Sequence, residues 1–124
     1  MSVLCIATAA ALVTLPVQSF TIAWTHSIEK VRWEEDYRVV DDAIIAGEAR
    51  VQGSAAGMEP PPGATLRGGW WHYVPAQARH AELRLTRSPY AADYDICTDG
   101  HCQSLAAVAP QRDGVTRLYP CRQP

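Results

Sequence analysis

The sequence predicts an all-β fold, with a single small antiparallel β-sandwich or partly open barrel as its architecture. Apolar and polar residues alternate with a period of two in several short segments, as they do in half-buried strands. No segment shows a long helical period with capping residues at its ends. Nine prolines and eight glycines separate the short segments. Short strands with turns about every eight to twelve residues are typical of sandwiches and small barrels.

Length and composition describe one globular domain over residues 1–124. Of the 124 residues, 48% are hydrophobic and 19% are charged. These values fit a folded domain of ordinary size and exclude a disordered chain. The net charge of −2 gives no basis for a nucleic acid as partner. No motif predicts a cofactor.

Residues 1–16 belong to an uncharged stretch that fits either a first buried strand or an export segment. A signal peptide begins with basic residues, but no Lys or Arg precedes Lys30. A membrane-spanning helix needs about 20 apolar residues, and Pro16, Gln18 and Ser19 interrupt the run. We therefore expect a buried first strand, with an export segment as the alternative.

The segments 19–29 and 31–39 form the clearest pair of predicted strands. On the first, one apolar face is shared by Phe20, Ile22, Trp24, His26 and Ile28. On the second, the corresponding face is shared by Val31, Trp33, Glu35, Tyr37 and Val39. Segments 81–87 and 115–119 alternate in the same way. Residues 52–63 predict the longest loop, because three successive prolines interrupt both helices and central strands.

His26 and Glu35 are the polar members of these apolar faces, where an unpaired polar group costs free energy. A hairpin that turns at residues 30–31 puts His26 opposite Glu35. The same register puts Trp24 opposite Tyr37 and so pairs aromatic with aromatic. We therefore predict a His26–Glu35 pair. Two roles stay open for it: a carboxylate that satisfies an imidazole, or an oriented general base or metal support.

The surroundings of this pair add no catalytic set. Ser27 points to the opposite face of an extended strand from His26, so the two do not form a base and a nucleophile. The segment GSAAG lacks the Gly-x-Ser-x-Gly spacing of a nucleophile elbow. No second metal ligand stands at a useful spacing, because the other histidines lie in separate segments: His72, His80 and His101. We therefore predict no catalytic residue and no metal ligand.

A second candidate ligand-binding site lies in the glycine-rich start of the long loop. Its residues are Gly53, Ser54, Gly57 and Met58. Small residues let successive backbone N–H groups converge on an anion or on the carboxylate of a ligand. The alternative is a tight connection that leads into the three prolines.

Two of the four cysteines bracket a predicted turn. Cys97 and Cys102 flank TDGH, in which Asp-Gly is a strong turn signal. Cysteines on either side of a tight turn lie close enough to form a disulfide in an oxidising compartment. Two alternatives stay open: unlinked small core residues, or a zinc site with His101 and Cys121, whose spacing does not match a zinc knuckle.

A longer pattern spans most of the chain, from about Phe20 to Cys102. It consists of FTIAWTHSIEKVRWEEDYRV, GSAAGMEPPPGATLRGGWWHY and LTRSPYAADYDIC. These stretches resemble a small bacterial family catalogued as domain of unknown function 1850. That family usually has Gly where this chain has Ala55. The resemblance favours one constellation: His26, Ser27, Trp33, Glu35, Gly53, Ser54, Gly57 and Met58.

The resemblance also carries an expectation about function. Members of the family are often encoded beside tripartite (TRAP-type) solute transporters, which implies an accessory or regulatory role and no reaction. We therefore expect a non-catalytic accessory or binding module whose partners are TRAP-type transporter components and a small organic anion. Such a role favours the periplasm or the inner membrane over the cytoplasm. Two alternatives stay open: an enzyme that uses the His26–Glu35 pair, or a structural partner that docks on a permease through an exposed tryptophan at 70–71.

Overall fold

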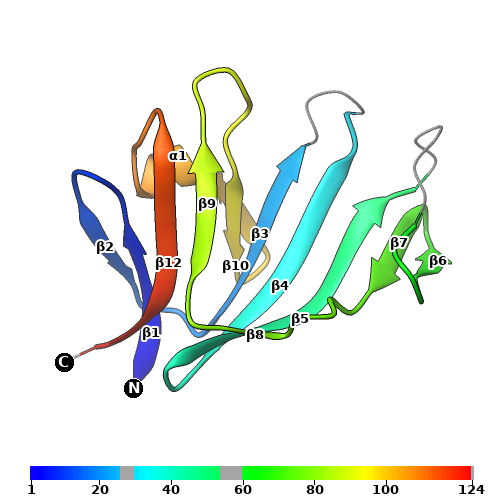
Figure 1. The fold of residues 1–124 in the computed structure, drawn as a ribbon, viewed down its shortest axis with the longest axis horizontal. Helices are drawn as coiled ribbons and strands as arrows, with labels where there is room; N and C mark the ends of the chain where they lie inside the picture. The colour runs from blue at the N-terminus through cyan, green and yellow to red at the C-terminus, as the bar shows by residue number, and fades with distance from the viewer. Residues whose placement is uncertain (26–29, 54–59, 124) are drawn as a thin grey trace.

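Two antiparallel β-sheets pack face to face in the computed structural model, which describes residues 1–25, 30–53 and 60–123 (Figure 1). The smaller sheet has the strand order β2-β1-β12-β9. The larger sheet has the order β11-β10-β3-β4-β5-β7-β6, and β8 pairs with β5 beside this path. The predicted all-β sandwich is therefore confirmed.

The strand bounds show how the chain divides between the sheets. The smaller sheet contains β1 (Ser2–Ala7), β2 (Leu12–Leu15), β9 (Leu83–Arg87) and β12 (Gly114–Arg122). The larger sheet contains β3 (Ser19–Thr25), β4 (Arg32–Val40), β5 (Ala43–Gln52), β6 (Thr65–Arg67), β7 (Trp70–Tyr73), β8 (Arg79–His80), β10 (Asp95–Thr98) and β11 (His101–Ser104). A one-turn helix, α1 (Leu105–Val108), follows β11.

The core lies between the two sheets, on the faces that the period-two pattern makes apolar. From the smaller sheet it receives Leu4, Ile6, Leu83 and Leu118, and from the larger sheet Phe20, Ile22, Tyr37, Val39, Ile44 and Ile96. Leu4 and Ile6 are fully buried because β1 pairs with β2 on one side and β12 on the other. Within the described part of the chain, no helix has the length and apolar character needed to cross a membrane.

The register of β3 against β4 differs from the predicted one. Glu35 lies opposite Ile22, and Trp24 lies opposite Trp33. The predicted register, which set Glu35 opposite His26 and Trp24 opposite Tyr37, is therefore wrong: the observed pairing is shifted by four residues. In the observed register the rings of Trp24 and Trp33 stack at 6.0 Å. Phe20 also stacks on Tyr37 in this register, so it forms two aromatic pairs where the predicted register forms one.

A disulfide between Cys5 and Cys121 ties the first strand to the last. The two residues are 116 positions apart in sequence, and their Cα atoms lie 5.8 Å apart. A second disulfide joins Cys97 to Cys102, five positions apart, across the β10–β11 hairpin. The pairing of Cys5 with Cys121 was not expected from the sequence, since spacing along the chain carries no information about so distant a partner.

Arg87, at the end of β9, is only 3% exposed and has all its nitrogens engaged. Its Nε and Nη2 donate to the two carboxylate oxygens of Asp93, at 3.0 and 2.8 Å. Its Nη1 donates to the carbonyl of Ala109 at 2.7 Å and to the hydroxyl of Thr116 at 3.1 Å. One guanidinium thus connects β9, the following loop, the end of α1 and β12.

Removing the two disulfides separately is expected to have unequal effects on the free energy of unfolding. Cross-linking restricts the unfolded chain more when the closed loop is longer, so Cys5→Ser/Cys121→Ser should cost about 4 kcal/mol or more and Cys97→Ser/Cys102→Ser about 2 kcal/mol. Urea unfolding of both double variants measures the difference. Equal losses would contradict the loop-length argument.

Arg87→Ala is expected to destabilise the protein by about 3 kcal/mol, because it removes one partner of a buried ion pair. Arg84→Ala is the matched control: Arg84 pairs with Glu82 on the surface and its side chain is 62% exposed, so it should cost less than about 1 kcal/mol. Chemical denaturation compares the two variants. Similar losses would show that Arg87 does not brace the sandwich.

Candidate functional site

The structure describes three members of the predicted constellation: Trp33 and Glu35, which lie on β4, and Gly53, which follows β5. The remaining members, His26, Ser27, Ser54, Gly57 and Met58, lie outside the described residues. Their sharing of a ligand with Glu35 therefore stays a prediction.

Glu35 lies on the inner face of β4, the face that is directed toward the smaller sheet. Its carboxylate accepts a hydrogen bond from the hydroxyl of Tyr37 at 2.6 Å. Tyr73 lies on the same face, because Glu35 pairs with Ala49 and Ala49 with Tyr73. Burial and then the charge of Glu35 raise the pKa of Tyr73, and burial with the Glu35 hydrogen bond raises that of Tyr37. Both tyrosines therefore stay neutral donors near a carboxylate.

Gly53 lies in a closely packed place at the end of β5. Its N–H donates to the carbonyl of Gly69 at 2.7 Å. A Cβ at this position would lie 3.1 Å from Cδ1 of Leu66 and 3.2 Å from Nε1 of Trp71. The absence of a side chain thus lets the end of β5 approach β6 and β7, which accounts for this glycine without an anion.

The tryptophan pair at 70–71 lies on β7. Trp71 pairs with Val51 and Trp70 with Gln52, so the two side chains face opposite sides of the sheet. Both are half-buried. Neither tryptophan is therefore a fully buried core residue, and neither is a fully exposed contact surface.

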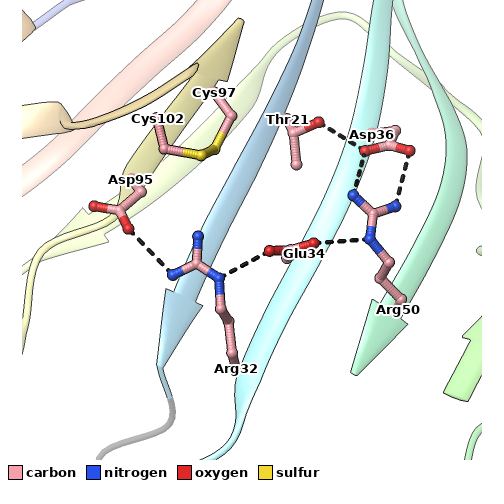
Figure 2. The surroundings of a disulfide bond; sticks show 8 residues. All are labelled: Thr21, Arg32, Glu34, Asp36, Arg50, Asp95, Cys97 and Cys102. Carbon is pink, nitrogen blue, oxygen red and sulfur yellow. Dashed lines mark hydrogen bonds and ion pairs between the residues drawn. A yellow bond between two sulfur atoms is a disulfide. The ribbon is translucent and has the colours of Figure 1, made fainter. Parts of the chain in front are cut away.

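The outer face of the larger sheet carries a connected network of ion pairs (Figure 2). Arg32 joins Asp95, at 3.2 Å, to Glu34, at 2.8 Å. Arg50 of β5 then joins Glu34, at 2.7 Å, to Asp36. At the far end, the hydroxyl of Thr21 donates to Asp36 at 2.7 Å. We call these six residues the ion-pair network: Thr21, Arg32, Glu34, Asp36, Arg50 and Asp95.

The arginines of the network keep its carboxylates ionised. Burial by itself raises the pKa of Glu34, but hydrogen bonds from Arg32 and Arg50 outweigh burial and hold the pKa below its ordinary value of 4.5. Burial also raises the pKa of Asp36, and hydrogen bonds from Arg50 and Thr21 hold it below 3.8. Hydrogen bonds to Asp36 and Glu34 in turn raise the pKa of Arg50. These groups hold fixed charges at neutral pH.

A hollow of about 620 Å³ opens over this face, next to the network. It is lined by residues of β3, β4 and β5 and by the β10–β11 hairpin. The register of β4 against β5 shifts between Glu35 and Tyr37, so that Gly47 and Glu48 together oppose Asp36. Gly47 lines the hollow at this bulge, and its lack of a side chain leaves the space open.

The disulfide between Cys97 and Cys102 forms part of the lining of the hollow. It lies on the same outer face as the network, because Cys97 pairs with Thr21 (Figure 2). The sulfur atoms of all four cysteines are used in the two disulfides, so they are not zinc ligands together with His101. Among the described residues, no group of three or more His, Cys, Asp or Glu side chains is arranged to hold a metal ion.

The sequence analysis did not single out this face. Arg32, Glu34 and Asp36 occupy polar positions of β4, and a run of charged residues usually forms no more than a solvated face. The missing information was the position of Arg50, which belongs to another strand and meets Glu34 only through the β4–β5 pairing.

Stability is expected to fall in acid through the network. The folded-state pKa values of Glu34 and Asp36 lie below the ordinary values of 4.5 and 3.8. The unfolded state therefore binds more protons in this range, so the stabilisation is present above pH about 4.5 and is lost as pH falls through the folded-state values. Urea midpoints at descending pH should fall less steeply for Glu34→Gln/Asp36→Asn. The exposed carboxylate variant Asp42→Asn should keep the wild-type slope, and an unchanged slope in the double variant would contradict this assignment.

Comparison with known proteins agrees with the resemblance in the sequence. The family model described as Domain of unknown function (DUF1850) matches residues 20–105. Comparison with curated proteins and with solved structures gives no match. The matched range runs from β3 to the first residue of α1 and contains the whole ion-pair network and the Cys97–Cys102 disulfide. Because the match covers more than half of the chain, the protein belongs to the DUF1850 family.

Proposed function

We propose that this protein is a non-catalytic binding module that works outside the cytoplasm as an accessory to a TRAP-type solute transport system. The observation that carries the binding function is the hollow on the outer face. Its volume of about 620 Å³ lies within the range of small-molecule sites. It is bordered by charged groups that are held in place by one another.

Fixed charges support binding better than catalysis. A general base at neutral pH needs a pKa near neutrality, whereas hydrogen bonds from arginines hold the pKa values of Glu34 and Asp36 below their ordinary values. A network in which each charge has a partner is also rigid. Rigid polar groups orient a ligand at little entropic cost.

The charges that line the hollow favour a ligand with a positive group. The lining contains the carboxylates of Glu34, Asp36, Glu48 and Asp99 and the guanidinium groups of Arg38 and Arg50. Arginines pair with three of these carboxylates: Arg32 and Arg50 with Glu34, Arg50 with Asp36, and Arg67 with Glu48. Within the described part of the chain, Asp99 is the lining carboxylate without such a pair. An amine or an amino acid matches this carboxylate better than the small organic anion that the glycine loop suggests.

The compartment and the partner are supported by separate arguments. Disulfides persist in oxidising compartments and are rare in the cytoplasm, and the chain contains two of them. The link to a transporter rests on the family resemblance. An accessory protein that holds a solute beside a transporter fits both.

Thermal unfolding with a panel of amines, amino acids, dicarboxylates, phosphate and divalent metals tests this function. A compound at about 100 times its Kd should add roughly 2.7 kcal/mol to the free energy of unfolding, which raises Tm by about 10 °C at this size. If no compound raises Tm, the protein is not a binding module for these solutes.

Two variants locate the site. A Cβ at Gly47 would meet Asp36 at an ordinary distance of 3.7 Å, and we expect the rest of the side chain in Gly47→Leu to extend into the hollow. It should abolish the ligand-induced rise in Tm, while the exposed control Ala107→Leu should keep it. Glu35→Gln should also keep it. Loss of the rise in Glu35→Gln but not in Gly47→Leu would move the site to the predicted constellation around Glu35.

A further inference from the structure

The two disulfides differ in their accessibility to a reductant. Cys5 is 4% exposed, and its sulfur lies 3.6 Å from the hydroxyl of Thr14. Its partner Cys121 is half-buried, so neither cysteine of this disulfide is exposed. Cys102, by contrast, is exposed, and its partner Cys97 is half-buried. Thiol–disulfide exchange requires a thiolate to reach one of the sulfur atoms. The Cys97–Cys102 disulfide is therefore the one that a reductant reaches first.

The outer strand of the hairpin closed by this disulfide lies at one edge of the larger sheet. Among the described strands, β11 pairs with β10 alone, at the edge of the sheet. All four of its residues, His101–Ser104, are exposed. Two kinds of contact hold β11 to β10: four residue pairs of the antiparallel ladder and the disulfide. Breaking it leaves an exposed edge strand that opens at low free-energy cost.

The same hairpin borders the proposed ligand site. Cys97, Cys102 and the turn residues Asp99 and Gly100 line the hollow. Cys97 pairs with Thr21, whose hydroxyl donates to Asp36 of the ion-pair network. Opening of the hairpin therefore removes part of the lining of the hollow. It also removes the strand that pairs with Thr21 and so disturbs the hydrogen bond between Thr21 and Asp36 (Figure 2).

We propose that reduction of the Cys97–Cys102 disulfide by a dithiol reductant opens the β10–β11 hairpin and weakens ligand binding in the hollow. This regulation rests on the binding function proposed above. The oxidised protein, in which the disulfide is intact, has the closed hairpin and binds the ligand. The reduced protein, in which Cys97 and Cys102 are free thiols, has the open hairpin. The Cys5–Cys121 disulfide stays intact and keeps the sandwich folded.

The exchange is balanced in electrons and protons. A thiolate of the reductant attacks Sγ of Cys102 and forms a mixed disulfide, while the bond to Cys97 breaks and the Cys97 sulfur takes a proton. The second thiol of the reductant loses its proton and attacks the reductant sulfur of the mixed disulfide. Cys102 is released and takes a proton. The protein gains two electrons and two protons, and the dithiol becomes a disulfide.

Selective reduction is tested without any ligand. The native protein is titrated with dithiothreitol, free thiols are alkylated, and peptides are identified by mass spectrometry. Cys97 and Cys102 should be alkylated at about tenfold lower dithiothreitol than Cys5 and Cys121, because access limits the exchange. Simultaneous reduction of both disulfides, or earlier reduction of Cys5–Cys121, would overturn the proposal.

Hydrogen exchange tests the opening of the hairpin in the selectively reduced protein. Amides of β10 and β11 should exchange about tenfold faster or more than in the oxidised protein, while those of β12 should not change. Unchanged exchange in β10 and β11 would overturn the proposal, since the hairpin would then stay closed without the disulfide.

Calorimetric titration with a compound that binds the oxidised protein tests the effect on the ligand. The Kd should rise about tenfold on selective reduction and in Cys97→Ser/Cys102→Ser, as expected for coupled sites. The control Arg84→Ala, which keeps both disulfides and changes an exposed side chain, should bind like wild type. If a compound binds and its Kd does not respond to reduction, the regulation is wrong and the binding function stands. If no panel compound binds the oxidised protein, the binding function itself fails.

Discussion

The stacking of Trp24 on Trp33 fixes how β3 pairs with β4, and the outer face of the larger sheet depends on that pairing. The two rings are nearly parallel, at an interplanar angle of 5°. Phe20, four residues before Trp24 in β3, stacks on Tyr37 of β4, with ring centroids 5.5 Å apart. These inner contacts place Thr21 beside Asp36 on the outer face. Aromatic packing inside the sandwich thus sets the geometry of a polar network outside it.

Three consecutive acidic residues of β4 show how much the face of a strand decides. Glu35 points inward and is hydrogen-bonded by a neutral tyrosine. Glu34 and Asp36 point outward, where arginines of two strands fix their charge. The bulge at Gly47 opens the hollow next to these outward carboxylates. Chemically similar side chains therefore serve the core in one case and a candidate binding surface in the other.

Rigid and yielding parts are separated in this fold. The Cys5–Cys121 disulfide and the buried guanidinium of Arg87 hold β1, β9 and β12 together around α1. The β10–β11 hairpin lies at one edge of the larger sheet, and one disulfide with an exposed cysteine cross-links its two strands. A change confined to that hairpin alters the hollow without loosening the core, which is the arrangement that a regulated binding module requires.

The sequence by itself determined the strands, their faces and the family. Alternation is a local property with a period of two, so it identified the inner residues Phe20, Ile22, Tyr37 and Val39 before any partner was known. Only the tertiary structure decided the register, because a shift by an even number of residues keeps every side chain on its face. Glu35 lies opposite Ile22 and not His26, which is such a shift. The Cys5–Cys121 pair, the position of Arg50 and the burial of Arg87 were likewise decided by contacts between distant segments, for which the alternating pattern contains no signal.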